Sequence, residues 1–184
     1  MAALAATRPA GDAHPVIVRR LQPQEAPLFK ALRLQALADS PDAFARTYAE
    51  INVKPDAYWE EMTRSVTAPG RHAMFIAEEA AAPAGMAFGL IDRDDPGLAG
   101  LGGMWVVPAA RGRGVGRALG DAVIAWARER GFGGVVLWVT DGNAAALALY
   151  KRLGFAATGR RDRLPANERL ETIEMRLALP PGAS

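Results

Sequence analysis

Short apolar runs alternate along the chain with longer segments in which apolar residues recur at helical spacing. The first run, residues 16–21, is rich in β-branched side chains and predicts a strand. Leucines and alanines three and four positions apart predict a helix over residues 26–37. A second helix is expected over residues 55–64, and residues 43–55 favour neither helix nor strand.

The middle of the chain changes to strand-like patterning. Residues 72–77, 85–91 and 101–107 are three short apolar runs, and residues 78–83 are expected to form the turn of a hairpin. This spacing predicts a meander of antiparallel strands. Residues 135–139 form a nearly continuous apolar run, which is typical of a strand buried on both faces of a sheet.

Two further helices and two closing strands complete the pattern. One helix has an apolar stripe that includes Leu119, Val123 and Trp126, and the other is expected over residues 144–153. Asn143 is a good N-cap for the second helix, and Gly154 lies where a C-cap belongs. The closing strands are expected over residues 155–158 and 170–179, with a loop over 159–169 between them. The order of elements predicts a mixed α/β sheet with helices on both faces.

Composition narrows the class of protein. The chain has 184 residues, of which 50% are hydrophobic, enough for one domain, expected over residues 16–180 after a disordered leader at 1–15. No cysteine is present, which excludes disulfides, thiolate zinc sites and a cysteine nucleophile. With two histidines far apart we expect no metal site. No apolar run reaches the roughly 18–20 residues of a membrane helix, so we expect a soluble, cytoplasmic protein without a membrane partner.

The charge is nearly balanced, at +2 overall, which is too weak for a typical nucleic-acid binder. Cations are locally dense at Arg111, Arg113 and Arg117. This cluster points to a small polyanion as ligand rather than to nucleic acid.

The same segment carries glycines at positions 112, 114 and 116, between a strand that ends near Val107 and the start of a helix. Glycines let the backbone turn its N–H groups inward, and the first amides of a helix have no partner within it. Such a loop suits a phosphate or pyrophosphate, with Arg113 and Arg117 at its rim.

Two common phosphate loops do not match this segment. A P-loop needs Gly-Lys-Ser/Thr at the helix start, whereas Gly116 is followed by Arg117 and Ala118. A dinucleotide fingerprint needs a third glycine where this chain has Arg117 or Leu119, depending on the starting glycine.

The segment Arg111–Gly116 matches R/Q-x-x-G-x-G/A and resembles the acyl-CoA signature of the GNAT N-acetyltransferase superfamily. Asn143, Tyr150 and the pair Gly154-Phe155 are similar to that family's downstream N-x6-Y-x3-GF segment. The likeness extends from about Val16 to Leu179. It implies a central, mostly antiparallel sheet of six to seven strands, splayed at the coenzyme A site and flanked by about four helices.

The resemblance also implies an activity, the transfer of an acetyl group from acetyl-CoA to a primary amine of a small molecule or peptide. The amine would attack the thioester directly in a ternary complex, because no cysteine is present to carry the acetyl group. Tyr150 would lie near the sulfur and protonate the leaving thiolate. The implied cofactor contacts are the backbone of Met104, Trp105 and Val106, the loop residues Arg111, Gly112, Arg113, Gly114, Val115, Gly116 and Arg117 around the pyrophosphate, and Asn143.

The general base is not assigned by the sequence. The strand at 101–107 contains no acid, and Trp138 stands where members that acetylate protein N-termini tend to have glutamate, which counts against that activity. A chain of waters is equally possible. The remaining candidate bases are Glu78, Glu79, Asp92, Glu171 and Glu174, of which the last two lie on opposite faces of one strand.

Other interpretations stay open. The missing acids favour, as a second hypothesis, a non-catalytic acyl-CoA-binding module, and a third is a nucleotide-phosphate binder of another fold. Arg113 and Arg117 taken singly fit surface residues, and Tyr150 fits a packing residue as well as a catalytic one. A homodimer is common in such families.

No motif in the sequence identifies the acceptor substrate. The segments expected to shape its site are residues 34–59, the hairpins near Glu78 and Asp92, and the 159–169 loop. The aromatic residues Phe44, Tyr48 and Trp59 favour a core role over a pocket. The cations of the last loop, Arg160, Arg161 and Arg163, hint at an acidic acceptor.

Overall fold

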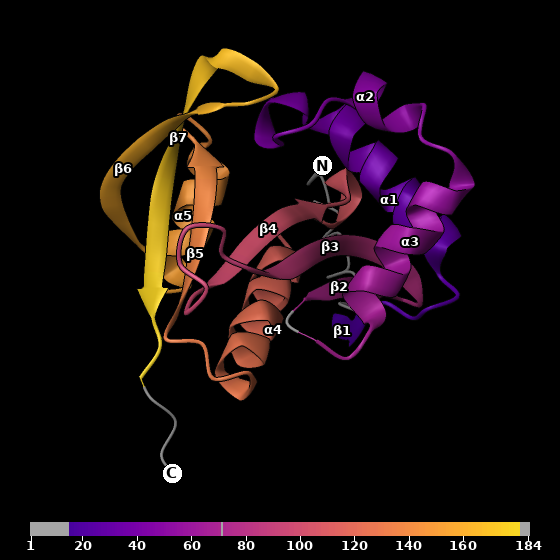
Figure 1. The fold of residues 1–184 in the computed structure, drawn as a ribbon, viewed down its shortest axis with the longest axis horizontal. Helices are drawn as coiled ribbons and strands as arrows, with labels where there is room; N and C mark the ends of the chain where they lie inside the picture. Colours follow the sequence, from indigo (N-terminus) through magenta and orange to yellow (C-terminus); the bar gives the residue numbers. More distant parts are fainter. Residues whose placement is uncertain (1–14, 71, 181–184) are drawn as a thin grey trace, which may run out of the picture.

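The structure, a computed structural model, describes residues 15–70 and 72–180, which form one sheet with helices on both faces (Figure 1). The strands are β1 (Ile17–Arg20), β2 (Ala73–Glu79), β3 (Ala82–Ile91), β4 (Ala99–Val106), β5 (Gly134–Thr140), β6 (Ala156–Leu164) and β7 (Asn167–Ala178). The α-helices are α1 (Ala26–Asp39), α2 (Tyr48–Asn52), α3 (Asp56–Thr67), α4 (Val115–Glu129) and α5 (Ala144–Arg152), with 3-10 turns η1 (Pro41–Ala43) and η2 (Pro108–Ala110).

The sheet opens between its two central strands. The strand order is β1-β2-β3-β4-β5-β7-β6, and every neighbouring pair is antiparallel except β4 and β5. Those two pair in parallel at Ala99 with Val135 and at Gly100 with Val136, and the ladder ends there. Beyond this point β4 and β5 diverge, as Figure 1 shows.

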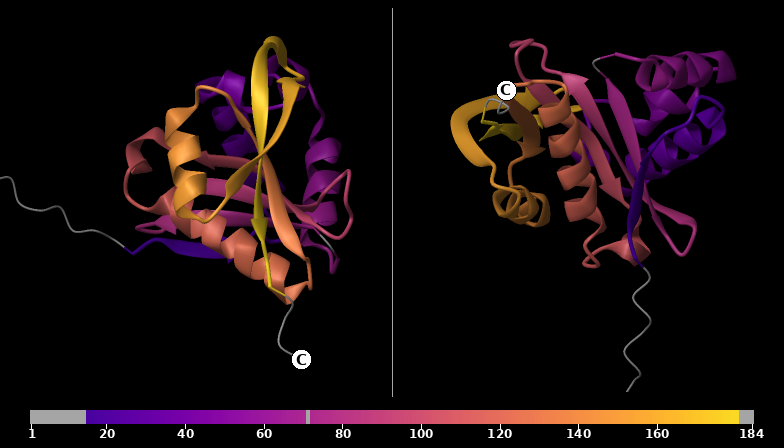
Figure 2. Two further views of the ribbon diagram at one scale, coloured as in Figure 1. Left: turned by 90° about the vertical axis from the view of Figure 1, so that its left-hand side faces the viewer. Right: turned by 90° about the horizontal axis from the view of Figure 1, so that it is seen from below.

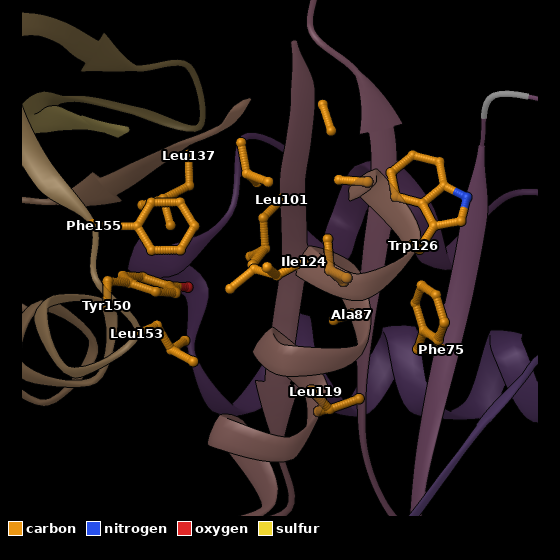
Figure 3. Packing of buried hydrophobic residues seen from close by; sticks show 14 of the residues in the cluster. Phe75, Ala87, Leu101, Leu119, Ile124, Trp126, Leu137, Tyr150, Leu153 and Phe155 are labelled. Atoms are coloured by element: carbon orange, nitrogen blue, oxygen red, sulfur yellow. The ribbon is translucent and has the colours of Figure 1, made fainter. Parts of the chain in front are cut away.

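Two apolar clusters cover the two faces of the sheet. Along β2, Met74 and Ile76 belong to the cluster with α1 and α3, whereas Phe75 between them belongs to the cluster with α4. The alternation follows from the strand geometry, in which successive side chains point to opposite faces. Figure 2 shows α4 and the α1–α3 group on opposite sides of the sheet, and Figure 3 shows the cluster around α4 and α5.

Helices α4 and α5 approach each other closely at a glycine. A Cβ on Gly120 of α4 would stand 2.5 Å from Cδ1 of Leu153, which follows α5. Because α4 packs on β2, β3 and β4 while α5 follows β5, this contact joins the two halves of the opened sheet.

The fold class predicted from the sequence is confirmed, with four corrections. Residues 159–169, expected to be a loop, lie mostly in β6 and β7, and the turn is confined to residues 165–166. The strand expected over 155–158 is the start of β6. The rest of β6 is exposed as far as Arg163, so it has no apolar alternation from which to predict its length. It is held by pairing with β7 and bulges between Ala157 and Arg161, where Gly159 has φ +90°.

The second correction concerns α2, a fifth helix in a segment of ambiguous pattern. Thr47 and Glu50 form a reciprocal capping box that starts this short helix. Third, the first hairpin turn is shorter than the expected 78–83. Strand β2 ends at Glu79 and β3 begins at Ala82, which leaves residues 80–81 as the turn. Fourth, Tyr48 is not a core residue, since it is 41% exposed. Trp59 is buried in the core as expected, whereas Phe44 is buried and also lines the cavity of the candidate site.

Two other expectations concern the leader and membrane-spanning helices. Of the leader expected at 1–15, residues 1–14 lie outside the described residues. Within the described ranges, no helix combines the length and the apolar character needed to span a bilayer.

Candidate active site

A bulge in β4 produces the opening of the sheet. The register between β3 and β4 shifts around Gly103, which has a φ of +56°. A side chain at Gly103 would collide with the ring of Phe88, so this position requires glycine both for its backbone angle and for its space. A bulge bends its strand and disrupts the ladder, which is why β4 leaves β5 after Gly100.

A cavity of about 80 Å³ lies in this opening. Its walls come from β4, β5, the first turns of α5 and the chain that follows η1. The lining residues are Ala43, Phe44, Leu101, Gly102, Gly103, Met104, Trp138, Val139, Thr140, Asn143, Ala146 and Tyr150. Sequence reasoning expected Met104, Asn143 and Tyr150 at one site, and the structure brings these three together.

The glycine-rich loop follows β4 and η2. Gly112 and Gly114 have φ angles of +75° and +90°, and a Cβ at either position would meet no atom within 4 Å. Gly114 caps α4, whose first backbone bond runs from Ala118 N–H to the Gly114 carbonyl. The amides of Val115, Gly116 and Arg117 therefore precede the hydrogen-bonded part of the helix and are available to an anion, together with the positive end of the helix dipole.

The arginines of this loop are held by acids. Arg113 forms an ion pair with Glu79 at 2.6 Å, and Arg117 pairs with Asp121 one turn along α4 at 3.4 Å. Their positive charge is thereby partly offset. The two side chains are thus already paired, whereas the first backbone amides of α4 have no partner within the helix.

Arg111 has a structural partner that the sequence did not reveal. Its guanidinium pairs with Asp39 at the end of α1, and its Nε donates to the Val106 carbonyl at 3.1 Å. Asp39 also accepts from Nε1 of Trp105 at 2.9 Å. Hydrogen bonds from Ser40, Trp105 and Arg111 lower the pKa of Asp39 to about 2. This cluster ties α1 to the end of β4, and no periodic signal in the sequence could have paired residues so far apart.

Tyr150 reaches the opening from α5. Its hydroxyl donates to Sδ of Met104 at 3.9 Å, and its ring packs edge-on against Phe155 (Figure 3). The residue is 8% exposed, and burial raises the pKa of its phenol to about 12. The hydroxyl is therefore a proton donor at neutral pH. Asn143 is confirmed as the N-cap of α5, since its Oδ1 accepts the Ala146 N–H at 3.1 Å.

All five candidate bases are described, each has a partner elsewhere, and none lines the cavity. Oδ1 of Asp92 accepts the N–H groups of Asp94 and Asp95 in the β3–β4 turn. The four glutamates form ion pairs: Glu78 with Arg19 at 2.7 Å, Glu79 with Arg113 at 2.6 Å, Glu171 with Arg161 at 2.8 Å and Glu174 with Arg160 at 2.8 Å.

A mostly antiparallel sheet that opens between its two central strands, with a glycine loop and a helix N-terminus at the open end, defines an acyltransferase class of fold. A family model described as the Acetyltransferase (GNAT) family matches residues 35–155. The chain belongs to this family, and the resemblance seen in the sequence is confirmed.

Curated relatives carry acetyltransferase names. A mycothiol acetyltransferase of Salinispora tropica is 36% identical over 133 residues, which cover 68% of this chain and 39% of the relative. A streptothricin acetyltransferase of Streptomyces lavendulae is 48% identical over 54 residues, 29% of each chain. The match to the Salinispora protein spans about two fifths of that relative's length.

Solved structures share the fold. A GNAT acetyltransferase of Streptococcus pneumoniae has a TM-score of 0.76 at 19% identity, over 90% of this chain and 100% of its own. The Salmonella typhimurium protein yncA, solved with its cofactor acetyl-CoA, has a TM-score of 0.74 at 20% identity, over 92% of this chain and 97% of its own. At these identities the likeness establishes architecture.

Proposed function

We propose that this protein is an N-acetyltransferase that moves an acetyl group from acetyl-CoA to a primary amine. The observation that carries the proposal is the opening between β4 and β5 at the Gly103 bulge, with the glycine loop and the start of α4 directly beyond the end of β4. An extended thioester carrier with a diphosphate needs both features, a free strand edge and convergent amides.

The residues present fit this co-substrate. The amides of the loop from Gly112 to Arg117 would hold the diphosphate, and the backbone of Met104 and Trp105 lies along the open edge of β4. The Val106 carbonyl already accepts a hydrogen bond from Arg111 Nε, so we assign the backbone contacts with the co-substrate to Met104 and Trp105. When bound, acetyl-CoA supplies the activated acetyl group as a thioester.

Tyr150 is the residue of this chain that we propose to move a proton. Its Oη lies on the cavity wall and keeps its proton until the pH approaches 12, which suits a donor to a departing thiolate. The five candidate bases are held in ion pairs or a turn, so we propose that the amine loses its proton to water before it attacks. Trp138, which stands where members that acetylate protein N-termini tend to have glutamate, lines the cavity.

The acceptor that we propose is a small-molecule amine. Two relatives in the comparison bear the names of small molecules, mycothiol and streptothricin.

Release of free thiol tests the activity. The protein is incubated with acetyl-CoA and a pool of small amines and peptides, and we expect thiol to appear with at least one acceptor. Binding of acetyl-CoA without release for every acceptor would contradict the proposal and favour the non-catalytic module.

Three further features are proposed with it. Residues 16–180 act as one domain, because β1 and β7 belong to the same sheet. The reaction takes place in the cytoplasm, where acetyl-CoA is available. The homodimer implied by the resemblance stays a prediction for sedimentation experiments.

A further inference from the structure

The cations that hinted at an acidic acceptor are paired with carboxylates on β7, in the β3–β4 turn and just after β5. Arg160 pairs with Glu174 at 2.8 Å and with Asp94 at 3.1 Å, and its guanidinium lies over the Trp138 ring. Arg161 pairs with Asp141 and Glu171, and Arg163 with Glu171 at 3.7 Å. These side chains hold the hairpin together and offer little charge to a ligand.

Arg33 differs from these arginines. It lies on α1, and its Nη1 is buried with no hydrogen-bond partner among the described residues. Its guanidinium stacks on Phe44, 4.6 Å from the ring centroid. Burial lowers the pKa of Arg33 to about 10, so the side chain stays cationic at neutral pH. Arg33 as a whole is partly buried, but its Nη1 is a buried donor of a charged group with no acceptor, which is unfavourable, and a bound anion would remove that penalty.

This guanidinium lies directly behind the cavity wall. Phe44 and Gly103 both line the cavity, and a Cβ built on Gly103 would stand 3.7 Å from Nη1 of Arg33. Gly103 and Phe44 are therefore the wall residues that lie next to this guanidinium, and Gly103 has no side chain to place between them. Contact between the guanidinium and a molecule in the cavity requires that the Phe44 ring move aside.

We propose that Arg33 determines acceptor specificity by binding a carboxylate of the substrate, so that the acceptors are small amines that also carry a carboxylate group. This inference rests on the proposed acetyltransferase function. The planar guanidinium matches a carboxylate with two parallel N–H···O bonds, and such charge-assisted bonds are the strong ones. The acetylated amine and the bound carboxylate would belong to one molecule, with the amine in the cavity.

Matched acceptor pairs test the inference. Each pair consists of an ω-amino acid and its carboxamide. Several methylenes separate the two groups, so the members differ at the carboxylate while the pKa of the amine stays nearly the same, and kcat/KM is measured by thiol release. We expect the parent protein to prefer the carboxylate member by about 10- to 100-fold. Arg33→Gln should remove that preference by lowering kcat/KM for the carboxylate member alone, and Arg33→Lys should restore part of it.

Lys30→Gln is the matched control, since Lys30 lies on the same helix but pairs with Asp56 at 2.7 Å at the surface. It should keep the full preference. Calorimetry with acetyl-CoA confirms that each variant is folded and binds the co-substrate. Equal turnover of both members by the parent, or a preference that survives in Arg33→Gln, would overturn the role of Arg33.

A second readout separates this inference from the proposed activity. The carboxylate member should raise the unfolding temperature of the parent more than the carboxamide does, and Arg33→Gln should abolish the difference. If no acceptor releases thiol but this difference is present, the acetyltransferase proposal fails while Arg33 remains an anion site. If thiol is released and the difference is absent, the inference about Arg33 fails alone.

Discussion

Tyr150 shows how one side chain changes its chemical character with its surroundings. In solution a phenol titrates near pH 10, but burial between α5 and β4 raises the pKa of Tyr150 to about 12. Its contact with Met104 places the hydroxyl at the opening of the sheet. The sequence supplied the tyrosine and its motif, whereas the burial that keeps it protonated comes from Phe155 and the surrounding cluster.

Replacement of Tyr150 by phenylalanine should lower turnover by about 100-fold, the scale of general acid catalysis, with little change in affinity for acetyl-CoA. In the parent, ionisation of Tyr150 should not reduce turnover until the pH approaches 12, because the raised pKa keeps the proton in place at all lower pH values. Thiol release from pH 6 to 10 and calorimetry check both points. Tyr58→Phe on α3 is the control, and unchanged turnover in Tyr150→Phe across pH would exclude the proton-donor role.

At the scale of elements, the junction of η2 with α4 combines a turn and a helix start in one segment. Gly112 and Gly114 adopt left-handed backbone angles that bend the chain after β4 and leave the first amides of α4 facing open space. The pattern of glycines predicted this junction correctly. Its position beside the opening depends on β4. The family resemblance implied that this strand splays from its neighbour, but no local pattern placed the bulge at Gly103.

Substitution of alanine for Gly114 should weaken acetyl-CoA binding at least 10-fold, because the methyl group enters the open space at the loop. Gly131, just after α4, is a close control, since it has φ +74° and equally open surroundings. Both substitutions place an L residue in the left-handed region and should cost about 1–2 kcal/mol of stability. Calorimetry measures the affinity for acetyl-CoA, and thermal unfolding measures the loss of stability. Equal affinities in the Gly114 and Gly131 variants would contradict a role for the loop.

At the scale of the whole molecule, the two halves of the sheet are joined by few backbone pairs. Strands β4 and β5 share two paired positions, and the remaining cohesion comes from side chains such as Leu153 against Gly120 of α4. A ligand that bridges the opening would therefore connect two parts of the molecule. Its binding should be visible as stabilisation of the entire fold.

Coenzyme A at about 100 times its Kd should stabilise the protein by about 2.7 kcal/mol, and for a domain of this size that raises the Tm by about 5–10 °C. Thermal unfolding with and without the ligand measures the shift. ATP and NAD at the same concentration should produce no comparable shift. An equal shift with ATP would instead support the nucleotide-phosphate binder.

Much of this protein follows from its sequence. Apolar periodicity predicted most strands and helices, because burial of one face imposes a period of 2 or 3.6 on the chain. Glycine spacing predicted the turn between β4 and α4, and Asn143 predicted the start of α5, because these are local backbone requirements. The start of β6 was predicted, but its continuation beyond Thr158 was not, because that part is polar and exposed and is held by pairing with β7.

The tertiary structure alone determined the contacts between residues that are distant in sequence. Asp39 meets Arg111, Arg33 lies behind Gly103, and all five candidate bases are already engaged with other groups. The sequence determines which local structures form, since their causes act over a few residues. Which charges find partners and which remain unpaired depends on how the sheet brings those structures together, because electrostatic interactions act through space rather than along the chain.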